Sequence, residues 1–396
     1  MFRLSPTRGV VWTGGFSFIP FLDKPPWFYR VLMSTGRIEY MSKTLMKTVS
    51  LAAVAGILAF SPAQDAQAKK VKWKMQAAFA STLAHLGPAG QRIADHITTA
   101  SGGRFTVKFF EPGALIPPLE CWDAVSKGSV ESCYTTAGYH TGKYPGLAFM
   151  TAVPFGPPAG EYTAWMWFGG GKDIADKIYS KHGLKSTVCG LIGPETSGWF
   201  KKPVKSLDDL KGMKMRFFGL GAKVMTKIGV STQLLAGADI YPALERGVID
   251  ATEFSMPNMD ISLGFYQIAK NNYYPGWHQQ ISTGEFLANK KMYDGLSDQN
   301  KRIIDIGCKA NMIYEYAETE ASNFGAMLEM KSKYGVTNRR WTDDQLAVFE
   351  KAWMEVVQEE SAKDATFKEF ADSFYSFRKN YKIWGEAQSL KPTYLK

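Results

Sequence analysis

Apolar and polar positions follow two successive series of strand and helix patterns along the chain. In the first series, alternating apolar positions mark strands, and apolar positions spaced three to four residues apart mark helices. The predicted elements are strands at 71–79, 105–110 and 130–135, and helices at 86–100 and 117–128. Strands that alternate with helices in this way are typical of a parallel sheet with helices on both faces.

The second series follows a loop rich in Pro and Gly and further helical stretches up to residue 183. Its predicted elements are strands at 185–192, 231–235 and 249–254, a short helix and a strand within 205–218, and helices at 222–229 and 240–247. Two α/β series on one chain predict two lobes with a cleft between them. Ligands in such sheets bind beyond the carboxyl ends of the strands.

The pattern becomes strongly helical from Ser297 onward. Ser297 is suited to cap the N-terminus of a run that ends only before Gly335, which is longer than an ordinary globular helix. A second helical run begins at Thr342, again at a capping residue, and the tail that follows is rich in aromatic residues that need packing partners. We therefore predict long C-terminal helices.

A different pattern precedes the α/β series. From Met41, a short basic stretch, an apolar run at 49–60 and an Ala-Gln-Ala site ending at Ala68 predict a cleaved secretory signal peptide over 41–68. The apolar run is too short to span a bilayer; an uncleaved anchor is the alternative. Residues 1–40 lack a structural pattern, and we interpret them as an upstream mis-start. The mature protein is expected to be exported and periplasmic.

The net charge and the spacing of cysteines and histidines exclude only a few classes of function. The net charge is +10, but the 47 Lys and Arg residues are scattered, which gives nucleic-acid binding little support. The four cysteines and five histidines show no zinc spacing such as C-x-x-C or H-x-x-x-H. Disulfides are possible in an exported chain. The sequence does not choose among three pairings or free thiols for the cysteines, which are Cys121, Cys133, Cys189 and Cys308.

Three charged residues stand at or near predicted strand ends. Arg216 lies within an apolar strand, and its planar fork matches a carboxylate with two parallel hydrogen bonds. Trp199 and the aromatic residues Phe217 and Phe218 would lower the dielectric around it. Glu195 and Glu253 could perform acid/base catalysis or hold a hard cation. The plainer alternatives are an arginine on the solvent side of an edge strand or one paired to an internal acid, and loop acids that form a cap or a surface pair.

Several longer motifs resemble one family. They are "FFEPGALIPPLECWDAVSKGSVE", "AVPFGPPAGEY", "SGWFKKPVKSLDDLKGMKMRFFGLGAKVMTKIGV", "YPALERGVIDATEF" and "GFYQIAKNNYYPGWH". In this order they resemble the extracytoplasmic solute receptors (DctP type) of tripartite ATP-independent periplasmic (TRAP) transporters, most of all the 2-oxo-acid-binding branch. The resemblance covers nearly all of 69–396. It implies a two-lobed periplasmic substrate-binding fold in which each lobe is a mostly parallel sheet flanked by helices.

The resemblance also implies a ligand set. Arg216 would clamp the ligand carboxylate, and a metal cation, with sodium first and calcium as the alternative, would bridge ligand and protein. The implied metal ligands are Glu195, Glu253, Phe254 through its carbonyl, and Gln279. The family pattern has Gln where this chain has Glu195 and Glu where it has Gln279, so two carboxylates remain. The implied substrate-binding residues are Arg216, Glu195, Phe254, Gln279, Phe79, Tyr139 and Trp199.

The function that follows is capture of a small organic acid anion, such as pyruvate, and its delivery to the small and large TRAP permease subunits. The alternative is a periplasmic lyase or hydrolase that uses Glu195 and Glu253. The expected organisation is one lobe at 69–190 plus about 280–300, a second at 191–279, and C-terminal helices at 301–396. These helices are expected to brace the lobes, and the branch suggests that they also form a homodimer.

Overall fold

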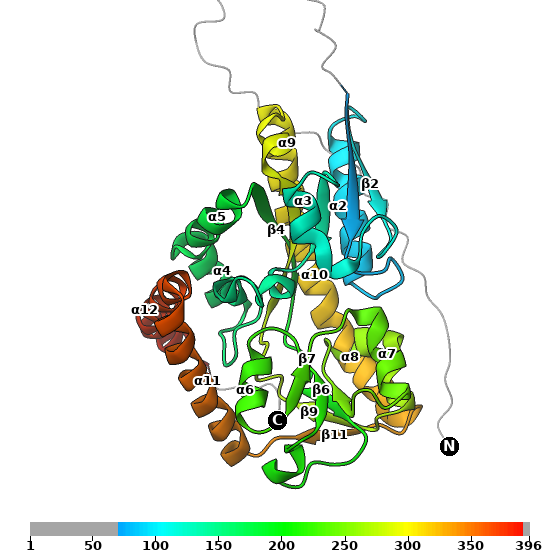
Figure 1. The fold of residues 1–396 in the computed structure, drawn as a ribbon, viewed down its shortest axis with the longest axis vertical. Helices are drawn as coiled ribbons and strands as arrows, with labels where there is room; N and C mark the ends of the chain where they lie inside the picture. Colours follow the sequence, from blue (N-terminus) through cyan, green and yellow to red (C-terminus); the bar gives the residue numbers. More distant parts are fainter. Residues whose placement is uncertain (1–69, 391–396) are drawn as a thin grey trace, which may run out of the picture. The chain divides into compact units, whose positions relative to one another are not determined.

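The strands of the chain form two mixed sheets (Figure 1). The computed structural model describes residues 70–390, so the predicted upstream segment and signal peptide lie outside the described residues. The first sheet has the order β2-β1-β3-β10-β4. Its strands are β1 (Val71–Ala77), β2 (Phe105–Phe110), β3 (Ser132–Thr135), β4 (Leu184–Ile192) and β10 (Ser282–Asn289).

The second sheet has the order β11-β9-β5-β8-β6-β7. Its strands are β5 (Gly198–Phe200), β6 (Lys214–Arg216), β7 (Ser231–Gln233), β8 (Ala251–Thr252), β9 (Asn271–Tyr274) and β11 (Thr337–Arg340). The last of these comes from a region for which the sequence pattern predicted only helices.

Both sheets contain antiparallel pairs beside the predicted parallel ones. Strand β1 runs parallel to β2 and β3, whereas β10 runs antiparallel to β3 and β4. In the second sheet β5 is antiparallel to β8 and β9. The cause is the path of the chain, which leaves the first sheet through β4 and returns to it through β10. Segments 193–197 and 275–281 make these two crossings.

Helices flank both sheets and extend beyond them. Their bounds are α2 (Leu86–Ala100), α3 (Cys121–Ser126), α4 (Ala159–Phe168), α5 (Gly171–Lys181), α6 (Gly221–Lys227), α7 (Gly237–Glu245), α8 (Pro257–Leu263), α9 (Lys290–Asp294), α10 (Asp298–Ser332), α11 (Asp343–Lys363) and α12 (Ala365–Gln388). Short 3-10 turns, η1 to η5, lie at Pro118–Glu120, Ala137–His140, Pro145–Met150, Leu207–Leu210 and Phe265–Gln267.

The predicted caps begin the long C-terminal helices. The Ser297 hydroxyl accepts a hydrogen bond from the Asn300 backbone N–H at 3.2 Å, which starts α10. Thr342 and Gln345 form a reciprocal capping box at the start of α11, with distances of 3.0 and 3.2 Å. These contacts satisfy backbone donors that the first turn of a helix leaves free.

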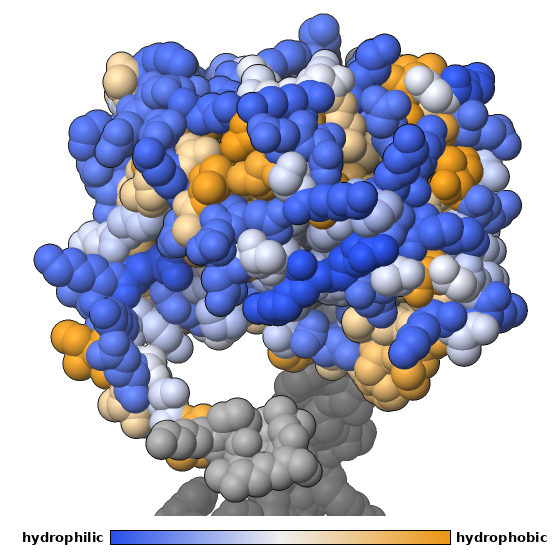
Figure 2. All heavy atoms as spheres, turned by 90° about the horizontal axis from the view of Figure 1, so that it is seen from below, coloured by the Kyte–Doolittle hydropathy of each residue, from blue (hydrophilic) through white to orange (hydrophobic). Residues whose placement is uncertain are grey.

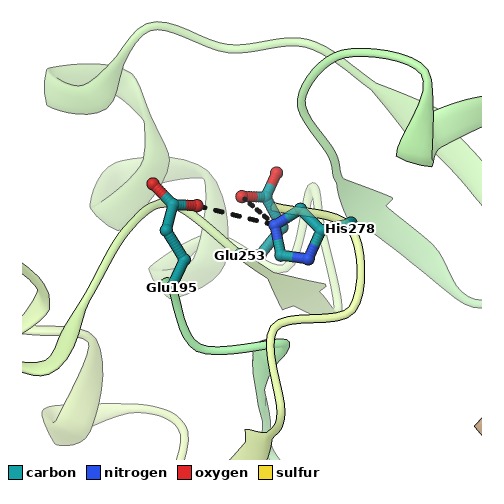
Figure 3. Close-up of side chains that lie close together, drawn as sticks. All are labelled: Glu195, Glu253 and His278. Carbon is teal, nitrogen blue, oxygen red and sulfur yellow. Dashed lines mark ion pairs between the residues drawn. The ribbon is translucent and has the colours of Figure 1, made fainter. Parts of the chain in front are cut away.

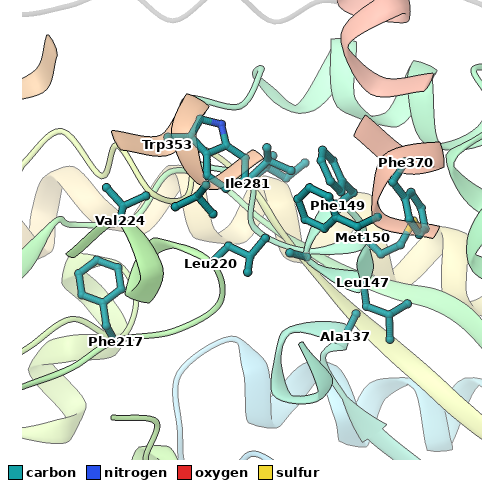
Figure 4. Close-up of a cluster of buried hydrophobic side chains, with 14 of the residues drawn as sticks. Ala137, Leu147, Phe149, Met150, Phe217, Leu220, Val224, Ile281, Trp353 and Phe370 are labelled. Carbon is teal, nitrogen blue, oxygen red and sulfur yellow. The ribbon is translucent and has the colours of Figure 1, made fainter. Parts of the chain in front are cut away.

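The C-terminal helices pack on elements of both sheets. Figure 4 shows a buried apolar cluster in which Phe370 of α12 lies beside Phe149, with parallel rings 5.8 Å apart. In the same cluster Trp353 of α11 lies near Val224 of α6. Helix α10 packs against β4, α2 and α8. One of the two buried apolar clusters therefore joins both sheets and the C-terminal helices.

Two disulfides settle the cysteine pairing that the sequence left open. Cys121 bonds Cys133, which ties α3 to β3, and Cys189 bonds Cys308, which ties β4 to α10. No free cysteine remains in the structure. Oxidised cysteines agree with the predicted export, because disulfides persist in oxidising compartments.

The face shown in Figure 2 is mostly hydrophilic. Figure 2 shows one face on which hydrophobic side chains form small separate patches among polar ones. Within residues 70–390, no helix combines the length and the apolar character that crossing a membrane requires.

Candidate functional site

The two crossing segments carry part of the site. Glu195 lies in 193–197, and His278 and Gln279 lie in 275–281. The segments touch: the Glu195 backbone N–H donates to the Gln279 carbonyl at 3.2 Å. A Cβ on Gly276 would come within 2.7 Å of the Glu195 carbonyl carbon, so only glycine fits there. The sequence "YYPGWHQQ" thus places two side chains directly beside Glu195.

Strand ends of the second sheet supply the charged pair. Arg216 ends β6 and Glu253 follows β8, and these strands are parallel neighbours with Arg216 opposite Thr252. The Arg216 Nη1 donates to a Glu253 carboxylate oxygen and to the Glu253 carbonyl, each at 2.8 Å. Both side chains are buried, 1% and 0% exposed. Arg216 therefore neutralises an internal acid, which explains a permanent cation inside an apolar strand.

Part of the Arg216 guanidinium remains available. Its Nε donates to the Leu235 carbonyl at 3.3 Å, and Nη1 is held by Glu253. Among residues 70–390, Nη2 has no hydrogen-bond partner. The rings of Phe218 and Phe254 lie 5.8 and 5.2 Å from the guanidinium carbon. Aromatic walls of this kind exclude water and strengthen any ionic contact that Nη2 makes.

His278 joins the two glutamates (Figure 3). Its Nε2 lies 3.5 Å from an oxygen of Glu195 and 3.5 Å from an oxygen of Glu253, and all three side chains are buried. The ligand atoms of the three residues lie within 4.8 Å of one another. Histidine spacing along the sequence did not indicate His278, because the three residues of this group come from three separate segments. Its position next to Gln279 was the available signal.

The electrostatics of this cluster favour a positive charge. Burial, with Glu253 nearby, raises the pKa of Glu195 to about 7. Burial opposes ionisation of Glu253 as well, but Arg216 and His278 outweigh it and hold the Glu253 pKa below its ordinary value. For His278, burial alone would lower the pKa, yet the two carboxylates raise it to about 9. The protein around His278 thus presents strong negative potential.

Several buried polar atoms at this place lack a partner. Within the part of the chain that the structure describes, no hydrogen bond satisfies one oxygen each of Glu195, Glu253 and Gln279, or either ring nitrogen of His278. Unsatisfied buried polar groups are rare and costly, and a bound ion, water or ligand is one way to satisfy them. The oxygen donors fit the cation that the sequence predicted, and the imidazole adds a donor that it did not.

A small cavity opens onto these groups. It is lined by six of the predicted residues together with others from both sheets: Phe79, Leu86, Thr136, Tyr139, Ile192, Glu195, Arg216, Phe218, Phe254, Gln279, Ser282, Thr283 and Gly284. Residues that are far apart along the chain, from Phe79 just after β1 to Gly284 in β10, therefore line the same small cavity. Its wall is largely aromatic and aliphatic. Glu195 and Arg216 are its charged lining residues, and we call them the charged floor.

Two predicted wall residues lie elsewhere. Trp199 is fully buried and absent from the cavity lining, because its indole N–H donates to Asp260 at 2.7 Å behind the sheet. Phe217 packs on Trp277 and on the His278 ring, with centroid distances of 5.9 and 5.0 Å. Side chains alternate across a strand, so neighbours of a cavity residue point away from the cavity. Phe217 supports His278 and does not line the space.

The wall also includes a contact between the sheets. Tyr139, in η2, meets Phe218 edge to face at 5.7 Å. A Cβ on the neighbouring Gly138 would overlap the Phe218 ring. The two sides of the cleft therefore touch above the cavity.

Comparison with known proteins places this arrangement among solute receptors. The family model "Bacterial extracellular solute-binding protein, family 7" (DctP) matches residues 77–364. A monocarboxylate 2-oxoacid-binding periplasmic protein of Nostoc sp. is 33% identical over 357 residues, which cover 89% of this chain and 97% of the relative.

Solved structures agree. A TRAP solute-binding protein from Pseudoalteromonas atlantica with bound sodium and pyruvate aligns with a TM-score of 0.78 at 29% identity, covering 81% of this chain and 97% of that one. One from Colwellia psychrerythraea with calcium and pyruvate gives 0.77 at 30% identity, covering 81% and 98%. One from Bordetella bronchiseptica, a mixed-occupancy dimer with copurified calcium and picolinate, gives 0.78 at 29% identity, covering 81% and 95%.

Proposed function

This chain belongs to bacterial extracellular solute-binding protein family 7, whose members are periplasmic receptors of TRAP transporters and not enzymes, and we propose that it captures a 2-oxo monocarboxylate such as pyruvate together with a bridging metal cation. The observation that carries the proposal is the set of partnerless oxygens of Glu195, Glu253 and Gln279 beside the free Nη2 of Arg216. A bound cation would satisfy the oxygens, and a bound organic anion would satisfy Nη2.

The carboxylate end of the ligand would meet Arg216. Because Nη1 is held by Glu253, the ligand takes the Nη2 side of the fork. Phe218 and Phe254 shield that contact from water. Charge-assisted hydrogen bonds are the strong ones, and burial strengthens them further.

The cation would sit among Glu195, Glu253 and Gln279, with the Phe254 carbonyl that the family resemblance adds. A bound metal would supply a positive centre for the oxygens of the organic acid. The related structures contain sodium or calcium with pyruvate, and the Nostoc relative is named for monocarboxylate 2-oxo acids. The cavity is small, so it suits a small ligand better than a bulky one.

Titration calorimetry tests this function. Thoroughly dialysed protein is titrated with pyruvate and with longer 2-oxo acids, with and without sodium or calcium. Glu253→Gln should weaken binding, whereas Glu315→Gln, a matched buried glutamate outside the cavity lining, should leave it within a few-fold of the unsubstituted protein. Absence of saturable binding for every 2-oxo acid, or affinity untouched by cation removal, overturns the proposal.

Delivery to the membrane completes the proposed role. Export through cleavage after Ala68 would place the receptor beside the small and large TRAP permease subunits. Amino-terminal sequencing of the exported protein should begin at Lys69. A mature protein that retains residues 41–68 contradicts the cleavage.

We also infer a homodimer through the C-terminal helices. On α10, Ile304 and Met312 are buried. Others remain exposed by 59–70%: Ile306, Ile313, Phe324 and Leu328. An apolar strip of this kind usually marks an interaction surface. Light scattering at micromolar concentration should give twice the chain mass, and a concentration-independent single-chain mass rejects the dimer.

A further inference from the structure

A second groove lies between the elements of the two sheets, next to the cavity. On the side of the first sheet it is lined by residues of segment 78–83, which follows β1, and of segment 111–118. On the side of the second sheet it is lined by residues 236–238 at the start of α7 and by residues 262–263 at the end of α8. We call this space the outer groove.

One aromatic side chain belongs to both spaces. Phe79 lines the cavity and the outer groove. It is 6% exposed, and its ring packs near Tyr134 and Tyr139, with centroid distances of 6.2 and 6.0 Å. The Phe254 ring, which lines the cavity, would lie 3.0 Å from a Cβ on Gly237, which lines the outer groove. At these two places little more than one aromatic ring separates the two spaces.

Hydrogen bonds fix the backbone on both sides of Phe79. The Ala78 N–H donates to the Tyr134 carbonyl at 2.9 Å, which joins the segment to β3. The Ser81 N–H donates to a carboxylate oxygen of Glu111 at 3.0 Å, which joins it to the end of β2. Because the segment is fastened to the first sheet, the position of the ring is fixed as well. Shortening the side chain should therefore join the two spaces.

The outer groove is suited to an uncharged aliphatic chain. Most of its lining side chains belong to alanine, proline, leucine and phenylalanine, and its one charged lining residue is Glu111. No lysine or arginine is among its lining residues, and Arg216 is the one cation among those of the cavity. A second carboxylate on the ligand would thus lack a positive partner, whereas CH₂ groups would gain free energy by leaving water.

We propose that Phe79 limits the chain length of the bound 2-oxo acid, and that the outer groove is an apolar subsite for the chain of a longer 2-oxo monocarboxylate once that side chain is shortened. The inference rests on the proposed function, because Arg216 would hold the carboxylate end of the ligand. In the unsubstituted protein the ring closes the cavity toward the outer groove. Short 2-oxo monocarboxylates therefore fit, and longer ones meet the ring.

Titration calorimetry with three 2-oxo acids tests the role of Phe79. Pyruvate is compared with 2-oxohexanoate, which has three more CH₂ groups, and with the dicarboxylate 2-oxoglutarate. The unsubstituted protein should bind 2-oxohexanoate at least about fivefold more weakly than pyruvate, because the chain would overpack the cavity. Phe79→Ala should raise the affinity for 2-oxohexanoate relative to pyruvate at least about tenfold. Each buried CH₂ group contributes about fourfold, and ordering the chain offsets a part of this gain.

Three further variants make the test specific. Phe79→Leu keeps an apolar side chain and should shift the same ratio in the same direction by a smaller factor. Ala238→Trp, introduced into the Phe79→Ala protein, fills the outer groove from an exposed position and should return the ratio to its value in the unsubstituted protein. Phe110→Ala removes a half-buried ring of β2 that lines neither space, and it should change the ratio by less than about twofold.

The outcomes separate this inference from the proposed function. An unchanged ratio in the Phe79 variants, with pyruvate still bound, overturns the inference and leaves the proposed function standing. A gain that Ala238→Trp does not reverse, or an equal gain for 2-oxoglutarate, overturns the apolar subsite. If Phe79→Ala does not fold, the Phe79→Leu protein decides, and an unshifted ratio there overturns the inference. If the unsubstituted protein binds none of the three acids, the proposed function fails and the inference fails with it.

Discussion

Replacement of Arg216 separates two roles that the structure gives to one side chain. Nη1 neutralises the buried Glu253, and Nη2 faces the cavity. Arg216→Ala removes both contacts. Arg216→Lys keeps a positive charge near Glu253, but an ammonium cannot reproduce the planar fork. The two variants should therefore differ in stability and agree in their loss of ligand.

The magnitudes follow from burial. With Arg216 and Glu253 1% and 0% exposed, removing one partner leaves an uncompensated buried charge, which costs about 3–5 kcal/mol of unfolding free energy. Loss of a charged hydrogen-bond partner in the desolvated cavity costs about 2–5 kcal/mol of binding, or about 30- to 4000-fold in affinity. Arg216→Lys should recover part of the stability and little of the affinity.

Calorimetry with pyruvate and urea unfolding measure the two effects on the same samples. Arg302→Ala is the control, because that arginine is 72% exposed and pairs with Asp305 on the surface of α10. It should change neither quantity by more than about 0.5 kcal/mol. Arg216→Ala that binds pyruvate within a few-fold of the unsubstituted protein refutes the role of Nη2, and unchanged stability refutes the role of Nη1.

Three further predictions concern groups outside the charged floor. Gly138→Ala should hold the cleft open by clashing with Phe218, lowering pyruvate affinity about 5- to 150-fold for an overpacking cost of about 1–3 kcal/mol; calorimetry that finds no change contradicts the contact. Replacing Cys189 and Cys308 with serine should remove about 4.9 kcal/mol of stability by the chain-entropy estimate for their separation of 119 residues, and equal urea midpoints for both proteins would argue against it. Burial raises the pKa of Glu315 from 4.5 to about 8, so its favourable contribution is full below pH 4.5 and is lost as the pH rises toward 8. Glu315→Gln should therefore gain stability relative to the unsubstituted protein between pH 5 and 8, and a constant difference across that range would refute the shift.

Sequence patterns correctly predicted those helices and strands whose bounds depend on neighbouring residues along the chain. The helix at 86–100 and the strand at 105–110 have the predicted bounds, and Ser297 and Thr342 cap the helices that they were expected to cap. The strands β5, β9, β10 and β11 were missed. β10 is buried along its whole length and shows no alternation, and the other three are three or four residues long with a register set by neighbouring strands. Periodicity cannot be read over so few positions.

The same distinction applies to the candidate site. Residues at strand ends could be predicted, whereas residues whose position depends on the path of the chain between the sheets could not. Arg216 and Glu253 were found because each stands at the end of a strand, and parallel neighbours bring strand ends together. His278 was missed, and Trp199 was placed wrongly in the wall, because both depend on how the chain crosses between the sheets. No spacing within one segment encodes the meeting of 193–197 with 275–281.

The bond between Cys189 and Cys308 decides which part of the receptor can move. It fastens α10 to β4, and the Asn311 side chain adds a 2.8 Å hydrogen bond to the Cys189 carbonyl. Toward the second sheet, α10 makes a weaker polar contact, a 3.4 Å bond from the Asn258 N–H to Asn323. We therefore expect α10 to move with the first sheet, and α8 to shift along α10 if the cleft opens. A fluorophore on α10 would therefore report opening as a changing distance to α7, and a constant one to α2.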